Sequence, residues 1–259
     1  MKRRKFVQSS LIGTSVIASG FPFAAASNQA DGKDIIELRE YELSFGGNQA
    51  NLHTYLKEAF IPALNKYGVR SVGIYSELGN FEPAKIYVLI PYPGIEEYFT
   101  IPSLISKDSD YILASRNYHS IPPENKVFNR FTTRLMIGFD GLPKLNASYK
   151  GSGIYELRTY EGYNEDAVRR KISMFNEVEL AIFRNNGINP VFFGEVIAGP
   201  DLPYLTYMVA FKDMAERNQK WAKFGADPDW NRIKVLPEYA NSVSNIIKKF
   251  LEPLPYSQV

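Results

Sequence analysis

The sequence contains no cysteine, which excludes disulfides, thiol catalysis, cysteine-ligated metals and a lipid anchor on cysteine. It also lacks a Gly-x-Ser-x-Gly nucleophile elbow, a phosphate-binding loop and a His-Glu-x-x-His zinc motif. Beyond the first 26 residues no apolar run is long enough to span a bilayer. The commonest motif-bearing enzyme classes and cysteine-based metal sites are therefore excluded.

The N-terminus resembles an export signal. Basic residues at Lys2 to Lys5 precede a short apolar stretch from Leu11 to Phe23, and Ala24 to Ala26 supply the small residues of a cleavage site. The run from Arg3 to Val7 is similar to a twin-arginine signal. We expect a signal peptide over residues 1–26, cleavage near Ser27, and export to the periplasm or another extracytoplasmic space.

Removal of this segment changes the charge balance of the chain. The full chain has 30 Lys and Arg against 28 Asp and Glu, and four of the bases lie in the signal, which has no acid. The remaining chain has 26 bases against 28 acids, so the basic surface expected of a nucleic-acid or anionic-lipid binder is missing. We expect no nucleic-acid partner and no stable membrane insertion of the mature protein.

An internal repeat organises the rest of the chain. Similar segments recur at a spacing of 119 residues, which indicates a duplication. The matching pairs are Ile36–Glu42 with Tyr155–Glu161, Gly68 with Gly187, Val72 with Val191, and Asp108–Tyr111 with Asp227–Trp230.

Each copy has the element order β-α-β-β-α-β, as judged from apolar periodicity and from turn and cap residues. The predicted strands are 35–43, 69–77, 85–91 and 127–139 in the first copy, and 153–161, 189–198, 204–211 and 242–251 in the second; the first helix of each copy is predicted at 49–67 and 164–186. This order predicts two tandem ferredoxin-like modules that form an intrachain pseudo-dimeric α/β barrel of the α+β class. The expected boundaries are 1–26 for the signal, 27–149 for a divergent first module, and 150–259 for the second.

The second copy resembles the NIPSNAP family. The resemblance is carried by Tyr155-Glu156-Leu157-Arg158-Thr159-Tyr160 at its start and Asp227-Pro228-Asp229-Trp230 near its end. It covers most of residues 153 to 251 and, more weakly, 35 to 139. It implies the dimeric α/β-barrel superfamily, which includes cofactor-independent monooxygenases and haem-binding proteins, but it brings no agreed catalytic residues.

Side chains alternate faces along a strand, so Glu156, Arg158 and Tyr160 share one face. We expect this face to point toward the opposite sheet, as do the matching residues Glu37, Arg39 and Tyr41. One interpretation makes these six residues a ligand-binding cavity in which arginine holds an anion and tyrosine donates a proton. The other, which we favour, is a structural network of Glu–Arg pairs with packed tyrosines.

Catalytic candidates are few. The only histidines are His53, early in the first helix, and His119, before a Pro-Pro loop; a haem or a proton-abstracting base would use one of them most simply. His53 and Tyr160 are the catalytic candidates, although a capping or surface role is the simpler interpretation of the histidines. Asp227 to Trp230 is interpreted as a helix start with Trp230 on the core, and no metal site is predicted.

Three function classes stay open. The first and preferred class is a module that binds a protein or a small apolar or anionic molecule. The second is an enzyme without cofactor, of monooxygenase or isomerase type, acting in the barrel cavity. The third is a haem-binding protein. No cofactor is predicted for the first two classes, and association of the chain with a second copy is open in all three.

Overall fold

Eight strands form one closed antiparallel barrel in the computed structural model, which describes residues 32–46, 49–79 and 81–259. Around the barrel the strand order is β1-β3-β2-β8-β5-β7-β6-β4. The predicted signal peptide lies outside the described residues. Among the described helices, none is both long and apolar enough to cross a membrane.

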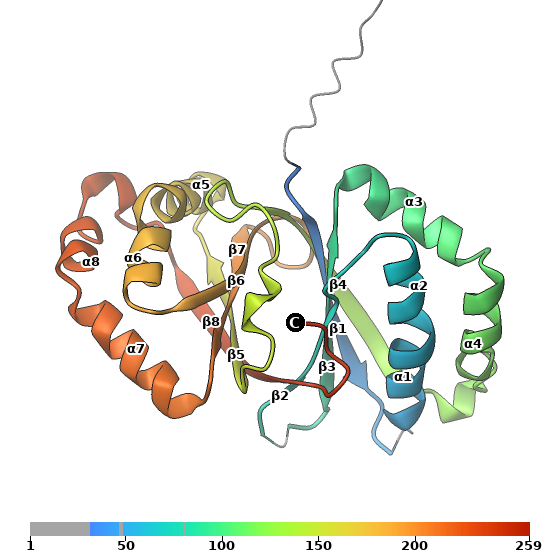
Figure 1. Ribbon diagram of the computed structural model, residues 1–259. Helices are drawn as coiled ribbons and strands as arrows, with labels where there is room; N and C mark the ends of the chain where they lie inside the picture. Colours follow the sequence, from blue (N-terminus) through green and yellow to red (C-terminus); the bar gives the residue numbers. More distant parts are fainter. Residues whose placement is uncertain (1–31, 47–48, 80) are drawn as a thin grey trace, which may run out of the picture. The chain divides into compact units, whose positions relative to one another are not determined.

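Helices flank the barrel on two opposite sides, with α1–α4 on one and α5–α8 on the other (Figure 1). The strands are β1 (Ile35–Leu43), β2 (Gly73–Glu77), β3 (Lys85–Tyr92), β4 (Phe128–Gly138), β5 (Ile154–Glu161), β6 (Asn189–Ala198), β7 (Tyr204–Phe211) and β8 (Asn245–Pro253). The α-helices are α1 (Gln49–Tyr55), α2 (Ile61–Lys66), α3 (Ile95–Ile105), α4 (Ser109–His119), α5 (Glu165–Met174), α6 (Leu180–Asn185), α7 (Met214–Ala226) and α8 (Pro228–Ile233). The π-helical turns are η1 (Leu56–Phe60) and η4 (Phe175–Glu179), and the 3₁₀ turns are η2 (Pro123–Asn125), η3 (Ala147–Tyr149) and η5 (Pro237–Tyr239).

The sequence patterns locate most of these elements. The bounds of β1, β6 and β7 agree with the prediction. The predicted helix at 49–67 is instead divided by the π-turn η1, and that at 164–186 by η4. Strand β2 begins at Gly73 rather than at residue 69.

The two halves of the barrel have the same internal order. The first half runs β4-β1-β3-β2 and the second runs β8-β5-β7-β6, and the halves join through the antiparallel pairs β2–β8 and β4–β6. Strands from both halves therefore share one hydrogen-bonded wall, although β4 pairs with β6, and β8 with β2, over only part of their length.

Several local features recur 119 residues apart. The turns η1 and η4 are related by this spacing. Gly68 and Gly187, at φ 93° and 72°, end the first helical region of each half in the left-handed conformation that glycine allows without a steric penalty. Asp108 and Asp227 each accept two backbone N–H groups at the starts of α4 and α8, as predicted for Asp227.

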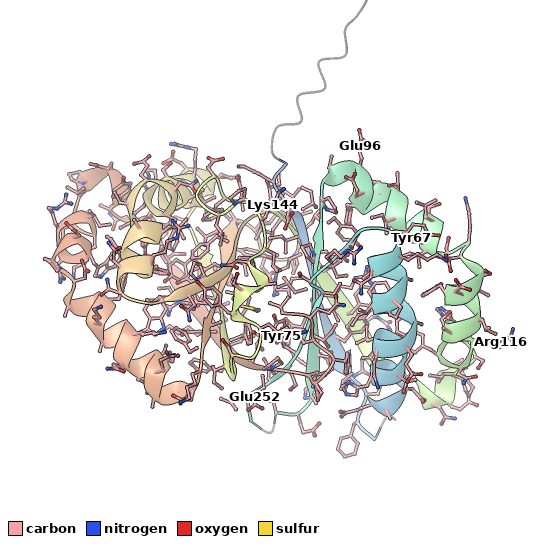
Figure 2. The ribbon with its side chains drawn as sticks, in the orientation of Figure 1. Tyr67, Tyr75, Glu96, Arg116, Lys144 and Glu252 are labelled. Atoms are coloured by element: carbon pink, nitrogen blue, oxygen red, sulfur yellow. The ribbon has the colours of Figure 1, made fainter. Side chains whose placement is uncertain are left out.

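The apolar core has three layers. One lies between the first half of the barrel and α1–α4, and a second lies between the other half and α5–α8. The third fills the barrel interior with side chains from both halves, among them Leu38, Tyr75, Leu157 and Leu251. Tyr75 is labelled in Figure 2. Trp230 packs against the second layer, as expected.

The predicted direction of the polar strand residues is wrong. Tyr155 and Leu157 point into the barrel, so Glu156, Arg158 and Tyr160 point outward under the helices. The error arises because both faces of β5 are covered, so that alternation separates the two faces without saying which one lies inside.

Candidate functional site

The predicted row on β5 forms a closed network under α7. Glu156 is fully buried and accepts hydrogen bonds from Arg217 Nε and Trp221 Nε1, at 2.9 and 2.7 Å. Arg158 donates to the same carboxylate at 2.9 Å, and its guanidinium lies 4.4 Å from the centre of the Trp221 ring. These contacts match the structural interpretation, in which each buried charge has a partner.

Tyr160 lies in the aromatic layer beneath the helices. The hydroxyl of Tyr207 donates to that of Tyr160 at 2.8 Å. Burial raises the pKa of Tyr160 to about 12, so its phenol stays protonated at neutral pH. Lys171 and Glu179 form a buried ion pair nearby, and burial raises the pKa of Glu179. Tyr160 is thus buried among aromatic rings.

The matching row on β1 is arranged in the same way. Arg39 Nε donates to Glu37 at 2.6 Å, and Thr133 and Tyr92 donate to the same carboxylate at 2.9 and 3.3 Å. The guanidinium of Arg39 lies 5.1 Å from the Phe60 ring of η1. This row also faces the helices and not the barrel interior, so the predicted direction is corrected here too.

Tyr41 packs edge-on against Phe128, with ring centres 5.1 Å apart. Burial raises the pKa of its phenol. It therefore packs as an aromatic residue of the first helical layer.

The two histidines lie on the outer helices. His53 Nδ1 is 2.7 Å from the hydroxyl of Tyr256, and burial lowers the pKa of His53. His119 Nε2 is 3.4 Å from the hydroxyl of Tyr111 at the exposed end of α4. The structure does not bring either histidine together with the Glu–Arg rows or with the barrel interior.

One end of the barrel interior changes from apolar to polar. On β1 the inward position after Leu38 is Glu40, on β5 Thr159 follows Leu157, and on β8 Lys249 precedes Leu251. Arg134 of β4 pairs in register with Leu38 and precedes Met136 on the same face. We call this end the polar mouth, defined by Glu40, Glu77, Lys85, Tyr87, Arg134, Thr159, Tyr204 and Lys249.

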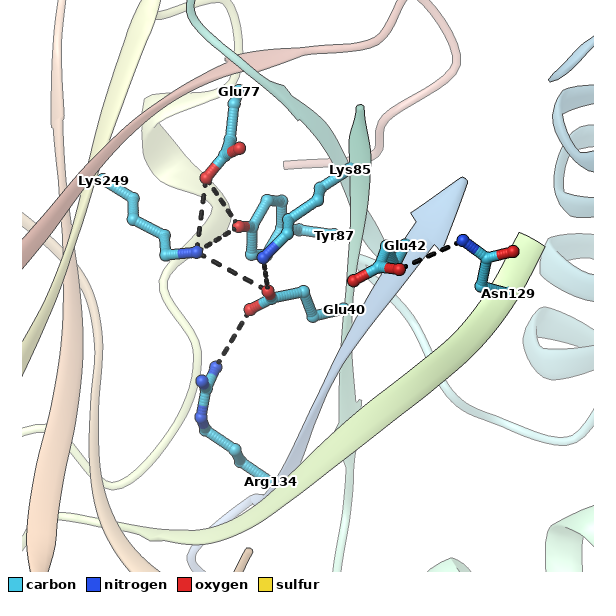
Figure 3. Close-up of polar contacts among 8 residues, drawn as sticks. All are labelled: Glu40, Glu42, Glu77, Lys85, Tyr87, Asn129, Arg134 and Lys249. Atoms are coloured by element: carbon cyan, nitrogen blue, oxygen red, sulfur yellow. Dashed lines mark hydrogen bonds and ion pairs between the residues drawn. The ribbon is translucent and has the colours of Figure 1, made fainter. Parts of the chain in front are cut away.

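Ion pairs and hydrogen bonds connect six side chains of the polar mouth, all except Thr159 and Tyr204 (Figure 3). Lys85 donates to Glu40 Oε1 at 2.6 Å, and Lys249 lies 3.5 Å from the same oxygen. Lys249 also donates to the Tyr87 hydroxyl at 2.7 Å, which in turn donates to Glu77 at 2.8 Å. Hydrogen bonds and ion pairs thus connect Glu77, through Tyr87 and Lys249, to Glu40.

The charges of the mouth stabilise the ionised form of Glu40. Burial alone would raise the pKa of this carboxyl, but the hydrogen bond from Lys85 and the charges of Lys249 and Arg134 outweigh burial and lower it. Glu40 raises the pKa of Lys85 through the same hydrogen bond. Glu40 and Lys85 are therefore both charged at neutral pH.

A cavity of about 210 Å³ opens within the polar mouth. It is lined by Glu40, Arg134, Leu157, Thr159, Glu161, Pro200, Asp201, Tyr204, Ile247 and Lys249. Two buried oxygens of this lining, Glu40 Oε2 and the Tyr204 hydroxyl, have no hydrogen-bond partner among the described residues. Arg134 lies 3.6 Å from Glu40 Oε2, too far for a hydrogen bond.

The cavity lies on the side where the second half of the barrel has the smaller residues. By register, Glu40 of β1 faces Tyr87 of β3, whereas Thr159 at the matching place in β5 faces Thr206 of β7. Two threonines therefore stand where the first half has a glutamate and a tyrosine. Of these two, Thr159 lines the cavity and Thr206 is fully buried.

Sequence reasoning missed this site, although a signal was present. Each of Glu40, Arg134 and Lys249 follows or precedes an apolar residue at a spacing of two, so a polar side chain ends an otherwise apolar face. These three residues come from β1, β4 and β8, so predicting that they lie together requires the strand register.

Part of the chain is similar to a known protein family. Residues 155–258 match the NIPSNAP family model. No curated protein matches the sequence.

Solved structures share the barrel. A candidate monooxygenase from Lactobacillus acidophilus has a TM-score of 0.53 at 9% identity and covers 85% of this chain and 94% of its own. One from Fusobacterium nucleatum has a TM-score of 0.54 at 10% identity and covers 86% and 93%. An uncharacterised NIPSNAP-like domain protein from Burkholderia xenovorans is 21% identical over 41% of this chain and 90% of its own, with a TM-score of 0.37. At these identities the likeness concerns the fold alone.

Proposed function

We propose that this chain is an exported, NIPSNAP-like small-molecule-binding protein whose ligand occupies the polar mouth of the barrel. The observation that carries the proposal is the cavity with two buried, unpartnered oxygens, Glu40 Oε2 and the Tyr204 hydroxyl. Buried polar atoms normally have partners, and leaving one without a partner costs about 1–3 kcal/mol. Neither oxygen has exposed surface, so a bound molecule would supply the missing hydrogen bonds once the two side chains turn toward the cavity.

The size of the cavity limits the ligand. Its volume is about 210 Å³. Pockets for drug-sized ligands span about 300–1,000 Å³. Below the mouth, Tyr75, Tyr155 and Leu251 fill the barrel interior. The ligand is therefore a small metabolite-sized molecule that stays near the opening.

We further propose that the barrel consists of two tandem ferredoxin-like modules that arose by duplication. The repeated strand order and the π-turns, glycines and aspartate caps at a spacing of 119 residues support this. The register pairs Arg134 with Leu38 and Lys249 with Leu157, so the two cations occupy matching places in the two modules. Both modules would thus contribute to one shared site.

A second candidate function is an enzyme without cofactor, of monooxygenase or isomerase type, that acts in the same cavity. The hydrogen-bonded chain from Lys249 through Tyr87 to Glu77 favours it, because such a chain can relay a proton to or from a bound substrate. The candidates His53 and Tyr160 do not line this cavity.

A haem site has less support than either. The cavity is smaller than most cofactor pockets, and its lining has no histidine, cysteine or methionine to bind the iron. Its one tyrosine, Tyr204, is kept protonated because burial raises its pKa, and His53 lies on α1, outside the barrel interior. Haem titration with detection of a Soret band tests this alternative directly.

The proposed site is tested by filling it. Thr159→Phe places a ring in the cavity, and Thr100→Phe, at an exposed site on α3, is the matched control. Both variants and the unaltered chain are purified gently from the host and weighed by native mass spectrometry. A small-molecule adduct on the unaltered chain and on the control, but not on Thr159→Phe, supports the site. An adduct that survives in Thr159→Phe contradicts it.

A further inference from the structure

We infer that the ligand of the polar mouth is a zwitterionic α-amino acid with a small aliphatic side chain. The inference rests on the proposed function and names the chemical class that the same cavity would select. It follows from three properties of the lining: a loosely paired arginine beside an acceptor oxygen without a hydrogen bond, the balance of charges, and a short apolar wall.

The first property concerns Arg134 and Glu40. The Arg134 guanidinium lies beside the Tyr204 hydroxyl and is paired with Glu40 Oε2 only loosely, at 3.6 Å. A guanidinium binds a carboxylate through two parallel N–H groups, and Oε2 of Glu40 requires a donor. A ligand that has a carboxylate next to a hydrogen-bond donor satisfies both groups at once.

The second property is the charge of the lining. It contains the acids Glu40, Glu161 and Asp201 against the bases Arg134 and Lys249. A simple anion would add negative charge to an acidic excess, and a simple cation would face both bases. An amino acid adds no net charge, while its ammonium group would interact with Glu40 and its carboxylate with Arg134 and Lys249.

The third property is the apolar part of the wall. Leu157, Pro200 and Ile247 line the cavity together with the charged groups, and Leu157 pairs in register with Lys249. A short aliphatic side chain would cover this surface and bury apolar area. The Tyr204 hydroxyl, which burial keeps protonated by raising its pKa, lies within the same lining and would donate to the ligand carboxylate.

The test uses four probes that share one carbon skeleton: L-valine, 3-methylbutanoate, L-valinamide and 2-hydroxy-3-methylbutanoate. Binding to the full mature chain is measured by isothermal titration calorimetry and by NMR shifts. We expect valine to bind and the butanoate and the amide to bind at least about tenfold more weakly, because each loses one charge-assisted contact. The hydroxy acid distinguishes a hydroxyl donor from an ammonium donor.

Two variants complete the test. Arg134→Gln is expected to abolish the preference for valine over valinamide, and Glu40→Gln the preference for valine over 3-methylbutanoate. Arg116→Gln, on the outer side of α4, is the control and leaves all affinities unchanged (Figure 2). Circular dichroism confirms that each variant is folded. If Arg134→Gln does not fold, Glu40→Gln and the probe series decide alone.

The possible failures are distinct. Equal binding of all four probes, or tighter binding of the hydroxy acid or the butanoate than of valine, overturns the amino-acid inference but keeps the site. No binding of any probe, with an adduct still lost in Thr159→Phe, also overturns the inference and leaves the proposed function intact. No binding and no adduct overturns both.

Discussion

Glu156 offers the sharpest test of the network under α7. Its carboxylate has no exposed surface and accepts four hydrogen bonds, two from Arg217, one from Arg158 and one from Trp221. Glu156→Gln keeps the shape of the side chain but leaves one acceptor oxygen where two stood. Two donors lose their partner, and the buried guanidinium of Arg158 loses its counter-charge.

The expected loss of stability is about 3–5 kcal/mol, the usual cost of removing one partner from a buried ion pair. Two lost hydrogen bonds to a charged group, at about 1.5–3 kcal/mol each, give a similar figure. This is a large share of the 5–15 kcal/mol that stabilises a typical domain. Urea unfolding followed by circular dichroism measures the effect, and Glu238→Gln on the exposed turn η5 is the matched control.

The same group predicts a pH dependence. Burial alone would raise the pKa of Glu156, but the hydrogen bond from Arg217 and the charges of Arg158 and Arg217 outweigh burial. The pKa in the folded protein therefore lies below the ordinary value. The contribution of Glu156 to stability is therefore complete at neutral pH and is lost as the pH falls below about 4.3 toward the folded pKa. A loss below 1 kcal/mol in Glu156→Gln, or ligand binding abolished at unchanged stability, would refute the structural role.

Two further predictions concern single positions. Gly187→Ala should destabilise the fold by about 1–2 kcal/mol because φ is +72° there. Gly225→Ala within α7, where an added Cβ meets no atom, should stabilise the fold by about 0.5–1 kcal/mol. Thermal unfolding of both variants measures the two effects, and effects of the same sign would contradict the backbone argument. His53 should titrate below pH 6.5 in NMR, since burial beside Tyr256 disfavours the imidazolium, and a midpoint at or above 6.5 would show that the ring is more exposed than described.

The sequence predicted the elements better than the directions of their side chains. Alternation located β1, β6 and β7, and the glycines and aspartate caps marked the ends of helices, because these signals are local. Which face of β1 and β5 lies inside the barrel depends on tertiary packing. Leu38 and Glu37 point to opposite faces of β1 and are both buried. The polar side chains were therefore predicted to point into the barrel, whereas they point toward the helices.

The polar mouth was beyond sequence reasoning for a related reason. Glu40, Arg134 and Lys249 come from strands far apart in the chain and meet only through the register of β1, β4, β5 and β8. The predicted Glu–Arg pairs formed because their partners are two residues apart on one strand, at Glu37 and Arg39 and again at Glu156 and Arg158. Short-range pairing was predictable, and assembly across the barrel was not.

Closure of the barrel within one chain has a consequence for how the protein tolerates dilution. In a barrel built from two separate subunits, the pairs β2–β8 and β4–β6 would be intermolecular, so the folding stability would decrease as the protein is diluted. Here those contacts form at a fixed effective concentration set by the connecting segment. Midpoints of unfolding should therefore be independent of protein concentration. The two junctions are short, four residue pairs between β4 and β6 and three between β2 and β8, so the rest of β4 and of β8 keeps one open edge to which a second chain can add.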